Sequence, residues 1–151
     1  MLEVLQLLHA QSSSIPTYHG SYYIRNLDKD EPLPNLGQEI PNSNLVQPEW
    51  IWLAYNRYDD KPLAMLVTAP AHGIVMLLRI YSVKVAPKSV MVGLLRRSLA
   101  AMSSRGYTRW VSFLDEARAT EASLIDIAIK AGATSAGGKH IMLTGPTDIK
   151  W

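Results

Sequence analysis

The 151-residue sequence contains no cysteine. That absence excludes a disulfide framework, a thiol nucleophile and a metal site built on thiolates. The four histidines, His9, His19, His72 and His140, are scattered without a ligand spacing such as H-x-x-x-H, so we predict no metal site. The length is that of one domain, which can bury a core without cross-links.

Strong net charge and long apolar runs are also absent. The net charge is +2 at pH 7 and the charged residues are interspersed, so no basic stripe indicates a nucleic-acid surface. No stretch is long and apolar enough to cross a bilayer, and the N-terminus lacks the basic region of a signal peptide. We therefore expect a cytoplasmic protein without a membrane partner. An RNA-binding function ranks last, because it rests only on a pI of about 8.9 and on surface arginines.

The most informative segment runs from Leu77 to Gly106, where an apolar strand leads through a proline into an amphipathic helix. The strand, Leu77 to Val85, alternates apolar and polar residues in its second half. Pro87 ends it, and because proline is tolerated at the start of a helix, the helix should begin just after it. Apolar residues then recur at three- and four-residue spacing, and Gly106 is placed to end the helix in the left-handed conformation.

Turn residues and hydrophobic periodicity predict further elements on both sides of this unit. Strands are expected at Trp50 to Tyr58, Leu63 to Thr68, Arg109 to Leu114 and Lys139 to Leu143, and a second helix at Glu116 to Ala131, with Gly132 as its terminator. Hairpin-connected strands followed by strand–helix crossovers specify an α+β or α/β fold. We predict a mixed, mostly antiparallel central sheet flanked by helices.

This order of elements resembles the GNAT superfamily of acyl-coenzyme A N-acyltransferases over residues 49 to 144. In that family a strand ending in a Val-x-Val-x-Pro-like segment leads into a loop whose backbone amides hold the pyrophosphate of coenzyme A. The segment Ser82 to Pro87 looks like that strand end. The resemblance implies acyl transfer from acetyl-CoA or another acyl-CoA to a small-molecule or protein amine. It implies a cofactor site made of Val83, Val85, Lys88, Ser89, Val90, Met91, Val92 and Gly93.

The cofactor loop departs from the family pattern. Members usually carry Gly-x-Gly or Gly-x-Ala at the helix start, because small residues let the pyrophosphate approach the amides. Here only Gly93 remains, and Met91 stands near the second glycine position, where its thioether would crowd the phosphates. The Tyr that many members use as general acid is replaced by Ala128. These departures indicate a degenerate cofactor site.

Acyl transfer sets three requirements for the catalytic residues. The amine must lose a proton, a backbone N–H must hold the tetrahedral oxyanion, and the thiolate must be protonated. The resemblance places the oxyanion donor near Val83. Tyr81 is the ionisable side chain close to that position, and Glu116, at the end of the next strand, is a weaker candidate. We therefore expect Tyr81, with Glu116 second, to relay a proton.

The first 48 residues are the least regular part of the chain, and the GNAT-like core is expected at residues 49 to 151. Leu2 to His9 has the apolar positions of a helix, and four prolines between Asn26 and Pro48 predict a long irregular arm that packs on the core. A GNAT domain usually opens with a strand. We expect that edge strand to be missing here or to be supplied by a partner.

An aromatic cluster precedes the arm at Tyr18, His19, Tyr22 and Tyr23. Rings of this kind suit an acceptor groove or a protein interface, and they equally suit the packing of the first helix onto the sheet. The sequence leaves these alternatives open.

The lost glycines also support an alternative function, a non-catalytic GNAT-like structural or interaction protein. Degenerate domains of this kind occur among bacteriophage proteins, including ones linked to particle assembly. The Pro-rich arm, the incomplete edge and the terminal Trp151 fit that alternative, because an exposed strand edge can pair with another chain. Its partners would be other protein subunits or copies of itself, in the host cytoplasm or in a virion.

Overall fold

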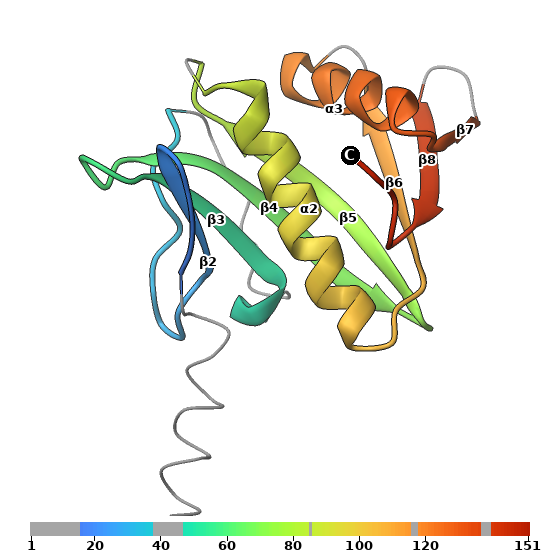
Figure 1. Ribbon diagram of the computed structural model, residues 1–151, viewed down its shortest axis with the longest axis horizontal. Helices are drawn as coiled ribbons and strands as arrows, with labels where there is room; N and C mark the ends of the chain where they lie inside the picture. Colours follow the sequence, from blue (N-terminus) through green and yellow to red (C-terminus); the bar gives the residue numbers. More distant parts are fainter. Residues whose placement is uncertain (1–15, 38–46, 85, 116–117, 137–139) are drawn as a thin grey trace, which may run out of the picture.

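The computed structural model describes residues 16–37, 47–84, 86–115, 118–136 and 140–151. Within these ranges eight strands form one sheet in the order β1-β2-β3-β4-β5-β6-β8-β7 (Figure 1). Neighbouring strands are antiparallel except for β5 and β6, which run parallel. The strands are β1 (Thr17–His19), β2 (Tyr22–Asn26), β3 (Ile51–Asn56), β4 (Pro62–Ala71), β5 (Ile74–Ser82), β6 (Arg109–Asp115), β7 (Thr134–Ala136) and β8 (His140–Pro146). Two α-helices, α2 (Lys88–Ser104) and α3 (Ala119–Lys130), complete the predicted fold class, which is thereby confirmed.

Local sequence signals define both ends of α2. Pro87 occupies the N-cap position with φ of −64°, so the helix begins at the next residue. At the other end Gly106 adopts φ of 94°, and the N–H of Tyr107 donates to the carbonyl of Met102 at 3.1 Å. This is the Schellman arrangement, which satisfies carbonyls at the end of a helix. Helix α3 ends in the same way at Gly132, with φ of 102°.

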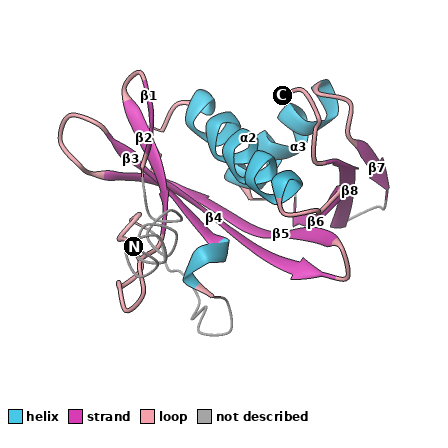
Figure 2. Ribbon diagram, turned by 60° about the horizontal axis from the view of Figure 1, so that its bottom comes forward, coloured by secondary structure: helices cyan, strands magenta, loops and turns pink. Residues whose placement is uncertain are grey.

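Both helices lie on the same side of the sheet (Figure 2). Their apolar faces join those of the strands in one buried cluster, to which α2 contributes Leu94, Leu95 and Leu99, and α3 contributes Leu124 and Ala128. Burial of this apolar area supplies most of the favourable free energy of folding. No helix in the described part of the chain has the length and hydrophobicity that a bilayer span requires.

The opposite face of the sheet is covered partly by the segment that follows β2. Leu27 and Leu36 from this segment pack on Leu53 and Met65 of the central strands. Arg25 fixes the start of the segment, because its guanidinium donates to both carboxylate oxygens of Glu31, at 2.7 and 2.6 Å. The same hydrogen bonds hold the pKa of the Glu31 carboxyl below its usual value. The described part of the Pro-rich segment is therefore docked on the sheet.

The edge of the sheet differs from the sequence expectation. A missing edge strand was expected, whereas Tyr22–Asn26 pairs with β3 along its whole length and Thr17–His19 extends the sheet beyond it. That expectation was wrong because the polar and aromatic residues of this hairpin do not form a simple apolar alternation. The short strand β7 was also missed, since all three of its residues are exposed. The helix expected at Leu2 to His9 lies outside the described residues.

Candidate functional site

A β-bulge changes the course of the central strand β5. The pairing of β4 with β5 shifts from Val67 opposite Arg79 to Thr68 opposite Leu77, so Leu78 is an extra residue. At the same level the parallel pairing of β5 with β6 stops, and its last pair among the described residues is Leu77 with Ser112. Bulges bend the strand that carries them. Beyond this point β5 and β6 diverge and leave a wedge between them.

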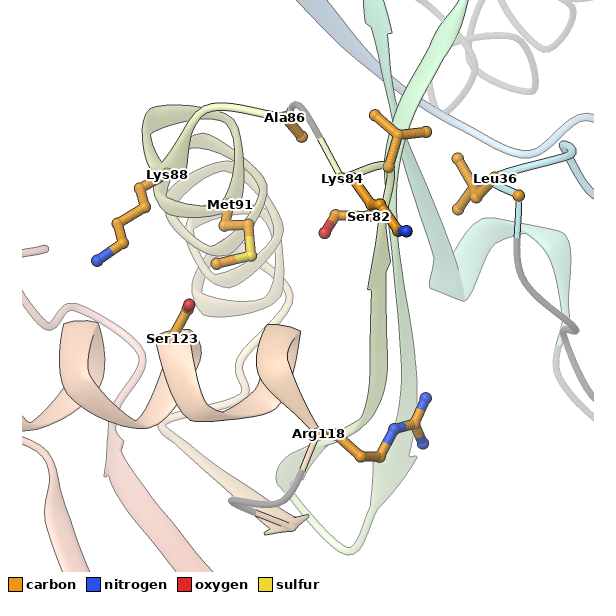
Figure 3. Close-up of a pocket in the computed structure, with 10 residues that line it drawn as sticks. Leu36, Ser82, Lys84, Ala86, Lys88, Met91, Arg118 and Ser123 are labelled. Atoms are coloured by element: carbon orange, nitrogen blue, oxygen red, sulfur yellow. The ribbon is translucent and has the colours of Figure 1, made fainter.

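A pocket of about 600 Å³ lies at the open end of this wedge (Figure 3). Its volume is within the range of small-molecule and cofactor sites. The end of β5, the start of α2, the start of α3 and the segment after β2 all contribute to its walls. The lining residues are Leu36, Gly37, Ser82, Val83, Lys84, Ala86, Lys88, Met91, Arg118 and Ser123.

The pocket is electropositive. Lys84, Lys88 and Arg118 line it, and none of the ten lining residues is acidic. The peptide dipoles of α2 place a partial positive charge at its N-terminus, where the N-cap residue, Pro87, makes no side-chain hydrogen bond to the first amides. Such a combination of free helix amides and cationic side chains favours a bound anion.

The pocket extends around the end of β5 from one face of the sheet to the other. Lys88, Met91 and Ser123 lie on the helical side of the strand, whereas Leu36 lies on the opposite side (Figure 3). Leu36 belongs to the buried cluster of that second face, together with Tyr81 of β5. Two ligands that approach from opposite faces can therefore meet at the end of this strand.

A buried carboxylate connects α3 to β5 across the wedge. Glu121, in the first turn of α3, has a side chain that is 0% exposed. Its Oε1 lies 2.5 Å from Nη1 of Arg79, and its Oε2 lies 3.2 Å from Nε of Arg118. The two arginine side chains remain 43% and 38% exposed. Within the described part of the chain, this cluster therefore holds two guanidinium groups and one carboxylate beside the pocket.

The structure brings together three of the eight residues predicted to hold the cofactor. Val83, Lys88 and Met91 line the pocket. Val90 is instead buried in the core at 1% exposure, and Ser89 is exposed, with its carbonyl accepting a hydrogen bond from the Tyr22 hydroxyl at 3.3 Å. Val92 does not line the pocket, and Val85 lies outside the described residues.

Gly93 has a packing role that the sequence did not reveal. It is buried on α2, and a Cβ atom at this position would overlap the hydroxyl of Tyr22 and lie 3.0 Å from its Cζ. It does not line the pocket. The absence of a side chain at Gly93 is therefore explained by the close approach of Tyr22 from β2.

Of the two residues predicted to relay a proton, the structure describes one. Tyr81 is 3% exposed and packs on the second face of the sheet, where the guanidinium of Arg118 lies 5.7 Å from its ring centroid. It therefore contacts a pocket residue without lining the pocket itself. Glu116 lies outside the described residues.

The structure also shows which backbone N–H groups near the predicted oxyanion position face the wedge. The N–H of Val83 donates to the carbonyl of Leu63 at 2.9 Å, so it does not face the wedge. On an antiparallel strand alternate residues bond to the same neighbour. The amides of Ile80 and Ser82 consequently face the side on which β6 diverges.

The aromatic cluster of the N-terminal hairpin divides between the two faces of the sheet. His19 and Tyr22 stack at 4.9 Å on the helical face, and Tyr18 and Tyr23 meet at 5.6 Å on the other. Burial, then Arg96 and Arg97, lower the pKa of His19, and burial raises the pKa of Tyr22. Burial and the hydrogen bond to Asp60 raise the pKa of Tyr23. None of these four side chains lines the pocket.

Sequence reasoning missed seven of the lining residues. Ser82, Lys84 and Ala86 stand in the segment that resembles the cofactor strand, so their positions carried a signal. The others, Leu36, Gly37, Arg118 and Ser123, reach the pocket from two separate segments, the one after β2 and the start of α3. Nothing in their local sequence indicates that proximity. No cluster of three potential metal ligands occurs in the part of the chain that the structure describes.

No protein-family model and no curated protein matches the sequence. Solved structures do match the fold. The ribosomal-protein-S5-alanine acetyltransferase from Vibrio fischeri has a TM-score of 0.66 and 8% identity, over 89% of this chain and 97% of that one. The ribosomal-protein-S18-alanine N-acetyltransferase from Escherichia coli has a TM-score of 0.53 and 16% identity, over 67% and 70%.

A third match is the PaiA N-acetyltransferase from Thermoplasma acidophilum in complex with coenzyme A, with a TM-score of 0.54 and 14% identity. The match covers 64% of this chain and 59% of the length of that enzyme. At these identities the comparison shows the fold, which is that of the GNAT acetyltransferases.

Proposed function

We propose that this protein is an acyl-CoA-dependent N-acyltransferase that acts on an amine. The observation that carries the proposal is the electropositive pocket at the diverging ends of β5 and β6, beside the open N-terminus of α2. The GNAT fold of the chain and the coenzyme A complex of one structural neighbour support it.

The residues of the pocket fit the phosphates of coenzyme A. Lys88 and the first amides of α2 would hold the pyrophosphate, and Lys84 would add a second cation. Met91, which the sequence places at a glycine position, is only 5% exposed and points toward Ser123 of α3 rather than toward Lys88 (Figure 3). Its thioether therefore leaves the helix amides accessible, and the altered loop is compatible with binding.

The chain would assist the chemistry in three ways. The bound cofactor supplies an activated acyl group as a thioester. The amide of Ile80, which faces the wedge, would donate to the acyl oxygen and stabilise its negative charge in the transition state. The positive charges of Lys84 and Arg118 would favour the neutral, nucleophilic form of the amine. As the amine nitrogen bonds to the acyl carbon and the C–S bond breaks, Tyr81 would relay the proton that the amine loses toward the departing thiolate, with Glu116 as the weaker candidate.

Isothermal titration with acetyl-CoA tests the cofactor site first. We expect micromolar affinity for the wild-type protein and a loss of about tenfold in Lys88→Glu, because charge reversal beside a phosphate removes an attractive contact and adds a repulsive one. The matched control is Lys130→Glu, which makes the same exchange at an exposed position in the last turn of α3. It should retain the wild-type affinity.

The outcomes separate this proposal from its alternative. No heat at millimolar acetyl-CoA would contradict the enzyme and favour a non-catalytic GNAT-like structural or interaction protein. The exposed rings of Tyr18 and Tyr58, at 59% and 80%, are the observation that fits that alternative. Trp151 does not add to it, because its ring packs 5.7 Å from Trp110 and its carbonyl accepts from Arg96.

The variant Tyr81→Phe tests the proton relay. Phenylalanine keeps the ring that packs beneath Arg118 and removes only the hydroxyl, so the fold should be unaffected. We expect turnover to fall at least tenfold if the hydroxyl carries the proton, since general acid–base contributions are of the order of 10² to 10⁴. Steady-state release of thiol from acetyl-CoA measures the effect. Unchanged turnover would remove Tyr81 from the mechanism.

A further inference from the structure

We infer that Arg118 forms an anion-binding subsite for the acceptor, so that the substrate is an amine that also carries a carboxylate. The inference rests on the proposed acyl transfer and specifies the chemical class of its acceptor. It is based on the position of the Arg118 guanidinium, on how that group is held, and on the charge of the pocket.

Arg118 reaches the face of the sheet opposite the helices. It occupies the N-cap position of α3 with an extended backbone, at φ of −90° and ψ of 121°. From there its guanidinium extends to the ring of Tyr81, at 5.7 Å from the centroid. Tyr81 and Leu36 belong to the cluster of the second face, and both Leu36 and Arg118 line the pocket. The guanidinium therefore stands on the side from which a second ligand would enter.

Two contacts fix the orientation of this guanidinium. Its Nε lies 3.2 Å from Oε2 of the fully buried Glu121, and the ring of Tyr81 lies within the range of a cation–π contact. Because this carboxylate lies at the Nε edge and no described residue pairs with the two terminal Nη groups, these groups would be available to a ligand. That fork matches the two oxygens of a carboxylate and can bind them in a bidentate manner.

The charge of the cluster favours an anion. Glu121 is shared between Arg79 and Arg118, so its single negative charge does not neutralise both. Among the described residues, three cationic side chains and no acidic one line the pocket. An acceptor with only an ammonium group would be repelled by this field, whereas a carboxylate on the same molecule would offset the repulsion.

The geometry separates this subsite from the proposed pyrophosphate site. Lys88 and the N-terminus of α2 lie on the helical side of β5, and Arg118 lies on the other side of the pocket (Figure 3). A phosphate of the cofactor and a carboxylate of the acceptor would consequently contact different cations. A substitution at Arg118 should affect one ligand without the other.

Titration monitored by nuclear magnetic resonance tests the subsite, with N-acetylglycine as the probe and N-acetylglycinamide as its uncharged match. We expect the wild-type protein to bind N-acetylglycine at least tenfold more tightly than N-acetylglycinamide, both with and without coenzyme A. In the Arg118→Gln variant the difference in affinity between the two probes should fall below twofold, while the affinity for acetyl-CoA stays within threefold of the wild-type value. Arg118→Lys, which keeps the charge but loses the fork, should retain only part of the preference.

The matched control is Arg79→Gln, which removes the other partner of Glu121 but no lining residue; it should keep the preference for N-acetylglycine. Equal affinity for the two probes, or a preference that survives in Arg118→Gln, would overturn the inference. A loss of acetyl-CoA affinity alone in that variant would assign Arg118 to the cofactor instead. Failure of the proposed function would give a different result. Acetyl-CoA would then not bind to the wild-type protein, whereas the titration with N-acetylglycine in the absence of coenzyme A would still test the subsite independently.

Discussion

Replacement of Glu121 by alanine is expected to lower the free energy of unfolding by about 3 kcal/mol, the cost typical of removing one partner from a buried ion pair. The side chain is fully buried and contacts two guanidinium groups. Its loss leaves a cavity in the wedge and removes the link between α3 and β5. The value stays at the lower end of the usual range because Arg79 and Arg118 are each about two-fifths exposed and can turn toward water.

Urea denaturation of matched variants tests this expectation. Glu121→Gln keeps the volume and one hydrogen-bond acceptor, so it should cost about 1 kcal/mol. Arg79→Gln removes the guanidinium that donates to the buried carboxylate, so it should cost about 2 kcal/mol, which is less than Glu121→Ala because Arg118 still lies 3.2 Å from Oε2. If Glu121→Ala were no less stable than Glu121→Gln, the carboxylate would not hold the wedge together. Loss of the N-acetylglycine preference in Glu121→Gln would show in addition that this side chain orients Arg118.

Replacement of Gly93 by leucine is expected to destabilise the protein by about 2–3 kcal/mol through overpacking. The new side chain would meet the ring of Tyr22, which is restrained by its stacking on His19 and by its hydrogen bond to the Ser89 carbonyl. The higher helix propensity of leucine offsets less than about 1 kcal/mol of this cost. The contact lies in the packing of α2 on β2, away from the pocket.

A double-mutant cycle with Tyr22→Ala measures the clash directly. In the Tyr22→Ala background the leucine at position 93 should cost at least 1 kcal/mol less than in the wild type, since the two side chains would no longer overlap. Ala100→Leu, at an exposed position of the same helix, should change stability by less than about 0.5 kcal/mol. Equal cost in both backgrounds, together with lost acetyl-CoA affinity, would restore Gly93 to the cofactor site.

Several elements could be predicted because their signals are local. Pro87 directly precedes α2, and Gly106 and Gly132 end the two helices with positive φ. These effects depend only on the covalent geometry of one residue and its neighbours. The N-terminal hairpin was missed because its strands contain tyrosines and a charged residue, whose burial depends on what the sheet places beside them.

The candidate site was predicted in part. Lys88, Met91 and Val83, which were expected to hold the cofactor, line the pocket, and they are contiguous with the recognisable strand end. Val90 and Gly93 were assigned to the same site by proximity in sequence, yet a helix turns successive residues to different faces, so both point elsewhere. Arg118 and Leu36 come from segments more than eighty residues apart, and no local pattern relates them.

The amino-acid sequence by itself determined the order of strands and helices from β3 to α3, the ends of α2 and α3, and the absence of thiol and disulfide chemistry. Only the tertiary structure decided where β5 separates from β6, which cations face the pocket, and that Glu121 is buried between two arginines. The physical reason is the range of the interactions. Backbone conformation and hydrophobic period are fixed within a few residues, whereas a bulge register, a buried ion pair and a shared pocket require residues distant in sequence to pack together.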